Sequence, residues 1–152
     1  MKGNDTMNGE PLTILLVEDN PDHAVLVTRN LEEFQVANKI FHVEDGEAAL
    51  DYVFGRGAYS DRKKYPRPDL ILLDLRLPRI DGLEVLKEIK SDNELHIIPV
   101  VILTTSDGER DMAMAYEHHA NSYVTKPVDF DRFAQLLKDI GFYWLAWNKR
   151  PW

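Results

Sequence analysis

Short runs of apolar residues alternate along the chain with longer stretches in which apolar residues recur every three or four positions. Each run is about four residues long and is followed by polar or turn residues, a pattern typical of buried parallel strands. The predicted strands are Thr13–Val17, Lys39–Val43, Leu70–Leu73, 100–103 and Ser122–Thr125.

Residues at helical spacing fill the segments between these runs. Asn20 can cap the first helix, with Pro21 at the first helical position, where the missing N–H costs nothing. Asp45 and Asp129 can cap the second and the last helices in the same way. The two remaining helices are predicted over residues 82–91 and 110–118.

Five alternations of strand and helix predict the α/β class, with an open, doubly wound parallel sheet covered by helices on both faces. We expect a disordered leader over residues 1–11, one domain over residues 12–140, and an aromatic C-terminal extension over residues 141–152. The connection over residues 55–68 is long, and such connections are usually functional or mobile. Its basic residues Arg62, Lys63 and Lys64 are expected to form a solvated face rather than a docking site.

The composition narrows the classes of function. The 152 residues carry a net charge of −8, which argues against nucleic acid or a membrane surface as a partner because both are polyanionic. The chain has no cysteine, which excludes disulfides, thiolate metal sites and cysteine nucleophiles and fits a cytoplasmic location. No apolar run approaches the roughly 20 residues that a membrane helix needs.

Polar residues follow four of the five predicted strands, at the sheet edge where ligands bind in this class of fold. Three carboxylates brought together there would repel one another and favour a divalent cation, and oxygen ligands point to Mg²⁺ or Mn²⁺. A lysine and a threonine hydroxyl can neutralise a phosphoryl group in transfer, and Asp74 in the middle strand is the natural nucleophile. The residues at the strand ends are Glu18, Asp19, Asp74, Thr104, Thr105 and Lys126.

Four segments, in order along the chain, resemble the motifs of response-regulator receiver domains. They span residues 14–21 with the acidic pair, 69–82 with Asp74, 99–104 ending in Thr104, and 123–127 with Lys126. The resemblance runs from about residue 12 to residue 140 and implies a flavodoxin-like sheet with strand order 2-1-3-4-5. It implies a single-domain response regulator of a two-component phosphorelay, which accepts a phosphoryl group from a sensor histidine kinase and thereby switches a protein-interaction surface. Such a protein is no enzyme for a separate substrate and catalyses only its own phosphorylation and dephosphorylation.

The resemblance also implies a role for each matching position. Asp74 is the phosphoacceptor, while Lys126 and Thr104 bind phosphoryl oxygens, with register favouring Thr104 over Thr105. Thr104 and the aromatic Tyr123 form the switch that moves inward on phosphorylation. The implied ligands of Mg²⁺, or of Mn²⁺, are Glu18, Asp19, Asp74 and the backbone carbonyl of Arg76.

The long connection and the aromatic C-terminal end both resemble the small regulators that partner phytochrome-type histidine kinases. All three tryptophans lie in the last nine residues, and a helix can bury only one stripe against its own sheet. We therefore expect exposed aromatic residues and a homodimer through the last helix, with the tail folding back onto the domain as the other interpretation. The expected interface residues are Phe142, Tyr143 and Trp147.

Three other functions are compatible with parts of the pattern. A receiver-like binding module could signal without phosphate, although the full set of acids, hydroxyl and lysine argues against it. A flavin-binding domain would need a phosphate-cradling loop after the first strand, where Glu18 and Asp19 would repel the phosphate. A metal-dependent phosphatase for other substrates would need a cap domain to select them. No DNA-binding domain follows in this sequence, so we expect the signal to pass through protein contacts or onward phosphotransfer.

Overall fold

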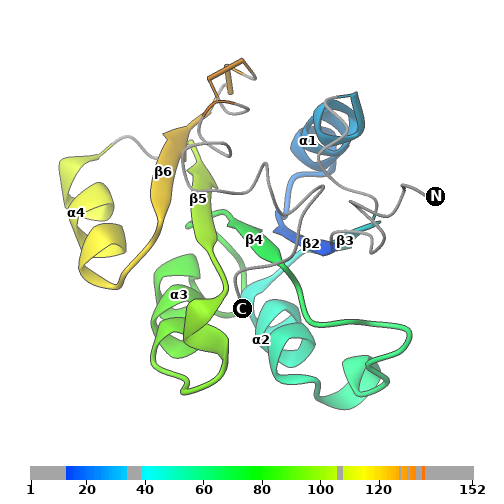
Figure 1. Cartoon of the computed structure of the whole chain (residues 1–152). Coiled ribbons are helices and arrows are strands. Elements are labelled where there is room, and N and C mark those ends of the chain that lie inside the picture. Colours follow the sequence, from blue (N-terminus) through cyan, green and yellow to red (C-terminus); the bar gives the residue numbers. More distant parts are fainter. Residues whose placement is uncertain are drawn as a thin grey trace.

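Five parallel strands build the centre of the computed structural model, which describes residues 13–33, 39–105, 108–126, 128–129, 131–132 and 135. Their order across the sheet is β3-β2-β4-β5-β6, which is 2-1-3-4-5 along the chain and confirms the predicted fold class (Figure 1). The predicted strand 100–103 ends one residue too early, because Thr104 still pairs with Thr125. The strands are β2 (Thr13–Val17), β3 (Lys39–Val43), β4 (Leu70–Leu73), β5 (Val100–Thr104) and β6 (Ser122–Thr125).

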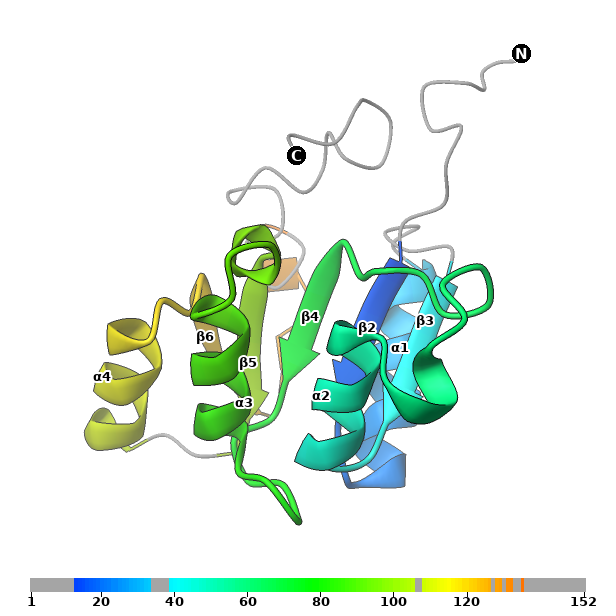
Figure 2. The ribbon, with the colours of Figure 1, turned by 90° about the horizontal axis from the view of Figure 1, so that it is seen from below.

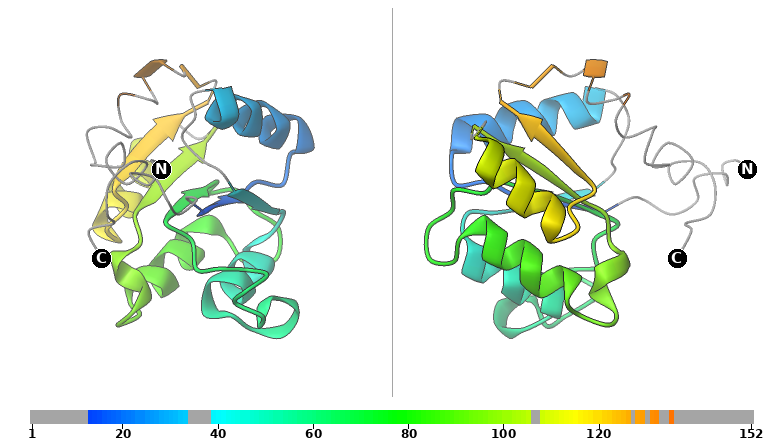
Figure 3. Two further views of the ribbon diagram at one scale, coloured as in Figure 1. Left: turned by 45° about the vertical axis from the view of Figure 1, so that its right-hand side comes forward. Right: turned by 90° about the vertical axis from the view of Figure 1, so that its left-hand side faces the viewer.

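Helices cover both faces of this sheet, as Figures 2 and 3 show: α1 lies on one face, and α2, α3 and α4 lie on the other. None of the helices in the described part of the chain is long and apolar enough to cross a membrane. The helices are α1 (Pro21–Glu33), α2 (Gly46–Phe54), α3 (Gly82–Lys90) and α4 (Glu109–Glu117), with short 3₁₀ turns η1 (Gly57–Tyr59) and η2 (Leu95–Ile97).

Three of the predicted helix boundaries shift by one residue. The helix predicted over residues 110–118 begins at Glu109, because extended Gly108 takes the N-cap position, and His118 has left the helical conformation. The helix predicted over residues 82–91 ends at Lys90, with Ser91 as its C-cap. Shifts of this size are usual at helix ends, where hydrogen bonding frays.

The predicted helix caps are formed by side chains. The Asn20 carboxamide oxygen accepts from the backbone N–H groups of Asp22 and His23 at 2.9 and 3.2 Å, and Asp45 accepts from Ala48 at 2.7 Å. Asp129 accepts from the N–H groups of residues 131 and 132 at 3.1 and 3.3 Å, and both of these residues are helical, as the predicted cap requires. The expected dimer residues Phe142, Tyr143 and Trp147 lie outside the described residues, and the homodimer stays a prediction from the sequence.

Alternate side chains of each strand point to opposite faces and fill two separate cores. On the α1 face, Ile14, Leu16 and Leu72 pack with Val27 and Leu31 of the helix. On the other face, alternate strand residues pack against residues of α2, α3 and α4. The strand residues include Leu15, Val17, Ile71, Leu73 and Ile102, and the helix residues include Val85 and Leu86 of α3 and Ala115 of α4. A slip of one residue in any strand would exchange the two cores, so the register of the sheet is strongly specified.

The long connection between α2 and β4 folds back onto the domain. The ring centroids of Tyr59 and Tyr65 lie 5.2 and 5.9 Å from that of Tyr52 of α2, and 5.0 Å from each other. The Arg62 guanidinium donates to the backbone carbonyls of Tyr52 and Val53 at 2.8 and 2.6 Å, and so satisfies carbonyls in the last turn of α2. The prediction of a solvated face is therefore wrong for Arg62, although the neighbouring Lys63 and Lys64 are exposed.

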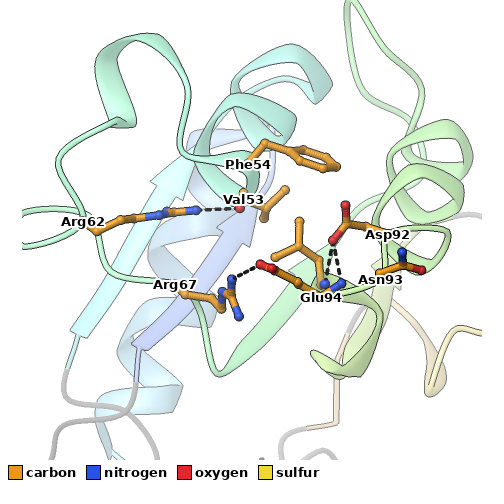
Figure 4. Close-up of a pocket in the computed structure, with 8 residues that line it drawn as sticks. Val53, Phe54, Arg62, Arg67, Asp92, Asn93 and Glu94 are labelled. Atoms are coloured by element: carbon orange, nitrogen blue, oxygen red, sulfur yellow. Dashed lines mark hydrogen bonds and ion pairs between the residues drawn. The ribbon is translucent and has the colours of Figure 1, made fainter.

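A shallow pocket lies between the C-terminal turn of α2 and the segment that follows α3, at the edge where the parallel strands begin (Figure 4). Its charged groups already have partners, because Arg67 Nη2 lies 3.2 Å from Glu94 Oε1 and Asp92 accepts from the N–H groups of Glu94 and Leu95. Those hydrogen bonds lower the pKa of Asp92. The pocket therefore offers a ligand no charged group that lacks a partner among the residues described.

We predict that Gly46→Ala destabilises the fold, because a Cβ at this position would lie 1.9 Å from the backbone oxygen of Ile80. Such overpacking typically costs about 1–3 kcal/mol. Gly108→Ala is the matched control, because nothing lies within 4 Å of a Cβ built there. Urea unfolding should show a loss for the first variant only, and equal stability of the two variants would contradict the packing described.

Lys90 provides a test that depends on pH. Burial lowers the pKa of this lysine to about 8, and its ammonium donates to the carbonyls of Ile98 and His96 at 2.7 and 3.0 Å. In the unfolded chain Lys90 has the ordinary lysine pKa of 10.5, so above pH 8 the unfolded chain binds more protons than the folded chain. The free energy of unfolding therefore increases as the pH rises. The free energy of unfolding of the wild type should therefore rise relative to Lys90→Met between about pH 8 and pH 10. The exposed Lys87→Met should show no such trend, and a flat difference for Lys90→Met would refute the prediction.

Candidate functional site

The carboxyl ends of β2, β4, β5 and β6 meet at one edge of the sheet, and the backbone extends the strand pairing just past each end. The N–H of Glu18 donates to Val43 at 3.0 Å, that of Asp74 to Val17 at 3.1 Å, and that of Lys126 to Thr104 at 2.8 Å. These bonds fix the backbone from which the polar side chains project. The strand ends named from the sequence are therefore brought together by the fold.

The acidic residues at this edge form a compact cluster. One carboxylate oxygen from each of Glu18, Asp19 and Asp74 lies within 4.8 Å of the others, and no other such metal-ligating group is found among the described residues. Glu18 and Asp74 are almost fully buried, whereas Asp19 is exposed. Oxygen ligands suit a hard divalent cation such as Mg²⁺. The exposed side of the cluster leaves room for the water molecules that Mg²⁺ usually keeps. The three side chains are suited to hold such an ion.

Lys126 reaches into the same cluster. Its ammonium, whose side chain is 7% exposed, donates to Glu18 Oε1 and lies 3.2 Å from Asp74 Oδ2. One ammonium against three carboxylates leaves the site with an excess of negative charge, which a cation would compensate. Burial raises the pKa of Glu18, while the hydrogen bonds from Lys126 and from the Asn20 N–H lower it in part.

Thr104 and Tyr123 occupy the positions that the sequence assigned to a switch. Thr104 is the last residue of β5 and is fully buried, whereas the next residue, Thr105, is exposed. Tyr123 pairs in register with Ile102 and packs against the core cluster on the face of α2, α3 and α4. Burial thus favours Thr104 over Thr105 as the hydroxyl at the site edge, and both residues lie on the strands nearest α4.

The loop after Asp74 is held in place by contacts that the sequence did not reveal. The Arg76 N–H donates to Asp74 Oδ1 at 3.2 Å, and the Arg76 guanidinium forms an ion pair with Asp111 of α4. A Cβ at Gly82 would lie 2.2 Å from the backbone oxygen of Asp74. The sequence placed Gly82 only at the start of a predicted helix, yet the glycine allows α3 to approach the back of the acidic site.

Two histidines also contact the site and were not predicted. His42 Nε2 of β3 lies 2.6 Å from the backbone oxygen of Glu18. His23 Nδ1 of α1 lies 3.0 Å from Lys126 Nζ. The sequence did contain a clue to the position of His23. A helix capped at Asn20 has His23 in its first turn, a few positions after the acidic pair Glu18 and Asp19.

Comparison with known proteins places this geometry in a family. A family model described as the response regulator receiver domain matches residues 14–138. The chain is 45% identical, over 93% of its length and 89% of the relative's, to the probable methanogenesis regulatory protein FilR2 of Methanothrix harundinacea.

Two solved structures extend the likeness. The crystal structure of the Mn²⁺-bound form of response regulator Rcp1 has a TM-score of 0.77 and 40% identity, over 93% of this chain and 100% of that one. The phosphorylated cyanobacterial phytochrome response regulator RcpA has a TM-score of 0.79 and 41% identity, over 94% and 100%. With the receiver model matching most of its length and the acids, hydroxyl and lysine gathered at one sheet edge, this chain belongs to the family of response-regulator receiver domains.

Proposed function

We propose that the chain is a cytoplasmic response regulator that accepts a phosphoryl group on Asp74 from a sensor histidine kinase. The observation that carries the proposal is the position of the Asp74 carboxylate, which has the Lys126 ammonium 3.2 Å from one oxygen and the acidic pair beside it. Family membership supports the reaction class, and the burial of Asp74 supports its choice as acceptor over exposed aspartates of the same loop.

The transfer needs little covalent chemistry from the protein. A carboxylate oxygen of Asp74 attacks the phosphorus of a phosphohistidine, the P–N bond breaks, and its electron pair returns to the imidazole nitrogen of the donor. An acyl phosphate forms on Asp74. Lys126 lies beside the attacking carboxylate, where its charge can offset the phosphoryl oxygens, and buried Thr104 is proposed to donate a hydrogen bond to one of them. Hydrolysis of the acyl phosphate on Asp74 releases inorganic phosphate and returns the carboxylate, so the protein is proposed to catalyse only its own modification.

The proposed cofactor is Mg²⁺, with Mn²⁺ able to replace it. Asp19, Glu18 and Asp74 would hold the ion, and the backbone carbonyl of Arg76 is proposed as a further ligand. When bound, the cation supplies positive charge to the transferring phosphoryl oxygens. The Mn²⁺-bound form of Rcp1 shows that a relative binds a divalent cation, which supports the proposal. Because the cluster carries more negative than positive charge, the ion also relieves repulsion among the three carboxylates.

The kinase is proposed to be of the phytochrome type, since RcpA, a phytochrome response regulator, shares 41% of its aligned residues with this chain. Thr104 and Tyr123 are proposed to carry the signal from Asp74 to the face formed by β5, β6 and α4. A protein partner there, rather than nucleic acid or a membrane, fits the net charge of −8.

We expect the wild type to gain one phosphoryl group when it is incubated with acetyl phosphate and Mg²⁺, as measured by intact-protein mass spectrometry. Asp74→Asn should gain none, because an amide is a poor nucleophile and forms no acyl phosphate. Asp81→Asn is the matched control, since Asp81 is an exposed aspartate of the same loop whose side chain makes no cap hydrogen bond. It should be modified like the wild type.

No gain by the wild type would instead favour the receiver-like module that binds partners without phosphate. A gain that persists in Asp74→Asn would assign the acceptor to another residue. Transfer from a phosphorylated phytochrome-type kinase, followed with the same variants, tests the proposed donor separately from the proposed acceptor.

We also predict that the acidic pair controls cation binding. Asp19→Asn should weaken Mg²⁺ or Mn²⁺ binding by at least about 10-fold, because even groups one shell further from a metal typically contribute about 10- to 100-fold. Asp22→Asn, an exposed acid in the first turn of α1, should bind the cation like the wild type. Isothermal titration calorimetry measures the affinities, and equal affinity of Asp19→Asn and the wild type would contradict the assigned site.

A further inference from the structure

Lys126 has a third partner that the proposed reaction does not explain. Its ammonium carries three N–H donors, and three acceptors surround it: Glu18 Oε1, Asp74 Oδ2 at 3.2 Å and His23 Nδ1 at 3.0 Å. The Lys126 side chain is 7% exposed, so water has little access to a donor left without a partner. A buried donor without an acceptor is costly, and His23 is therefore needed to complete the set.

The contact with Lys126 implies which ring nitrogen of His23 carries the proton. A lysine ammonium has no lone pair and only donates, so Nδ1 of His23 accepts and the ring proton lies on Nε2. His23 is thus a neutral acceptor beside a site that already holds three carboxylates. A fourth acid at this position would also accept from Lys126, but it would add negative charge that competes with the incoming phosphoryl group for the ammonium.

His23 is held in place independently of Lys126. Its backbone N–H donates to the Asn20 cap at 3.2 Å, and the helix buries Ala24 and Val27 in the core on the α1 face. Its side chain is 37% exposed, so one part of the ring faces solvent while Nδ1 faces the site. The imidazole therefore lies at the border between the buried ammonium and the side from which the site is open.

We propose that His23 is a positioning residue for phosphoryl transfer, which holds the Lys126 ammonium toward Asp74 through a hydrogen bond that the neutral imidazole accepts. This inference rests on the proposed function of Asp74. The two N–H groups that donate to Glu18 and His23 hold the ammonium in place. The third N–H group can then change its acceptor from the Asp74 oxygen to a phosphoryl oxygen while the nitrogen stays where it is. Such preorganisation avoids reorganising a charged group during the reaction.

The test compares two substitutions of His23. His23→Asn keeps an acceptor oxygen close to the place of Nδ1, whereas His23→Leu fills similar space without one. The rate of phosphorylation by acetyl phosphate with Mg²⁺ should fall about 10- to 150-fold in His23→Leu, the factor that corresponds to one hydrogen bond with a charged group, and should largely recover in His23→Asn. Val25→Asn, an exposed position on the same helix, is the control and should react like the wild type.

A second measurement needs neither the phosphodonor nor the cation. In ¹⁵N-lysine-labelled protein, the exchange of the Lys126 ammonium protons with water reports their hydrogen bonds, and Lys126→Met identifies the signal. Exchange should accelerate in His23→Leu and stay slow in His23→Asn, while the thermal midpoints of the variants remain similar.

The outcomes separate the two proposals. A wild type that takes up no phosphoryl group overturns the function proposed for Asp74, while the exchange measurement still tests the contact. Uptake at equal rates in the wild type and His23→Leu overturns the positioning role alone. Equal slowing in His23→Asn and His23→Leu, or slowing in Val25→Asn, overturns the acceptor explanation.

Discussion

One ammonium placed among buried carboxylates is the interaction on which the site depends. Glu18 and Asp74 are 2% and 7% exposed as side chains, and burying either charge alone would be costly. Lys126 compensates part of that cost, and the remaining negative charge makes the site a place for a cation and a phosphoryl group. The same burial explains why the backbone around these residues is so firmly bonded to neighbouring strands. Stability and chemistry thus place opposite demands on the same three side chains.

The parallel sheet is what makes that arrangement possible. Side chains separated by more than a hundred positions, such as those of Glu18 and Lys126, meet because parallel strands end at one edge. This is also why most of the fold and the site could be predicted from the sequence. The apolar runs are short and uninterrupted, the side-chain caps Asn20, Asp45 and Asp129 lie where the helices begin, and the reactive groups directly follow the strands.

What could not be predicted depends on neighbours that only the folded chain provides. Arg62 looks like a solvated loop residue in the sequence, but it satisfies carbonyls in the last turn of α2 because the tyrosines fold the connection back. Gly46 and Gly82 lie at the starts of helices, where many residues would fit, and only the close approach of Ile80 and of Asp74 explains the missing side chain. In each case the local pattern was compatible with several environments, and tertiary packing selected one of them.

The contacts of Asp74 also indicate how a change of charge there would spread. Its two carboxylate oxygens have different partners, the Arg76 N–H on one and Lys126 on the other. Arg76 is paired in turn with Asp111 in the first turns of α4, and Lys126 directly follows β6. A phosphoryl group adds negative charge to a carboxylate whose partners both lead toward α4 and β6, whereas Glu18 and His23 connect the ammonium to β2 and α1. Arg76 thus gives Asp74 a direct ionic connection to α4 through Asp111, which lies beside the route proposed through Thr104 and Tyr123.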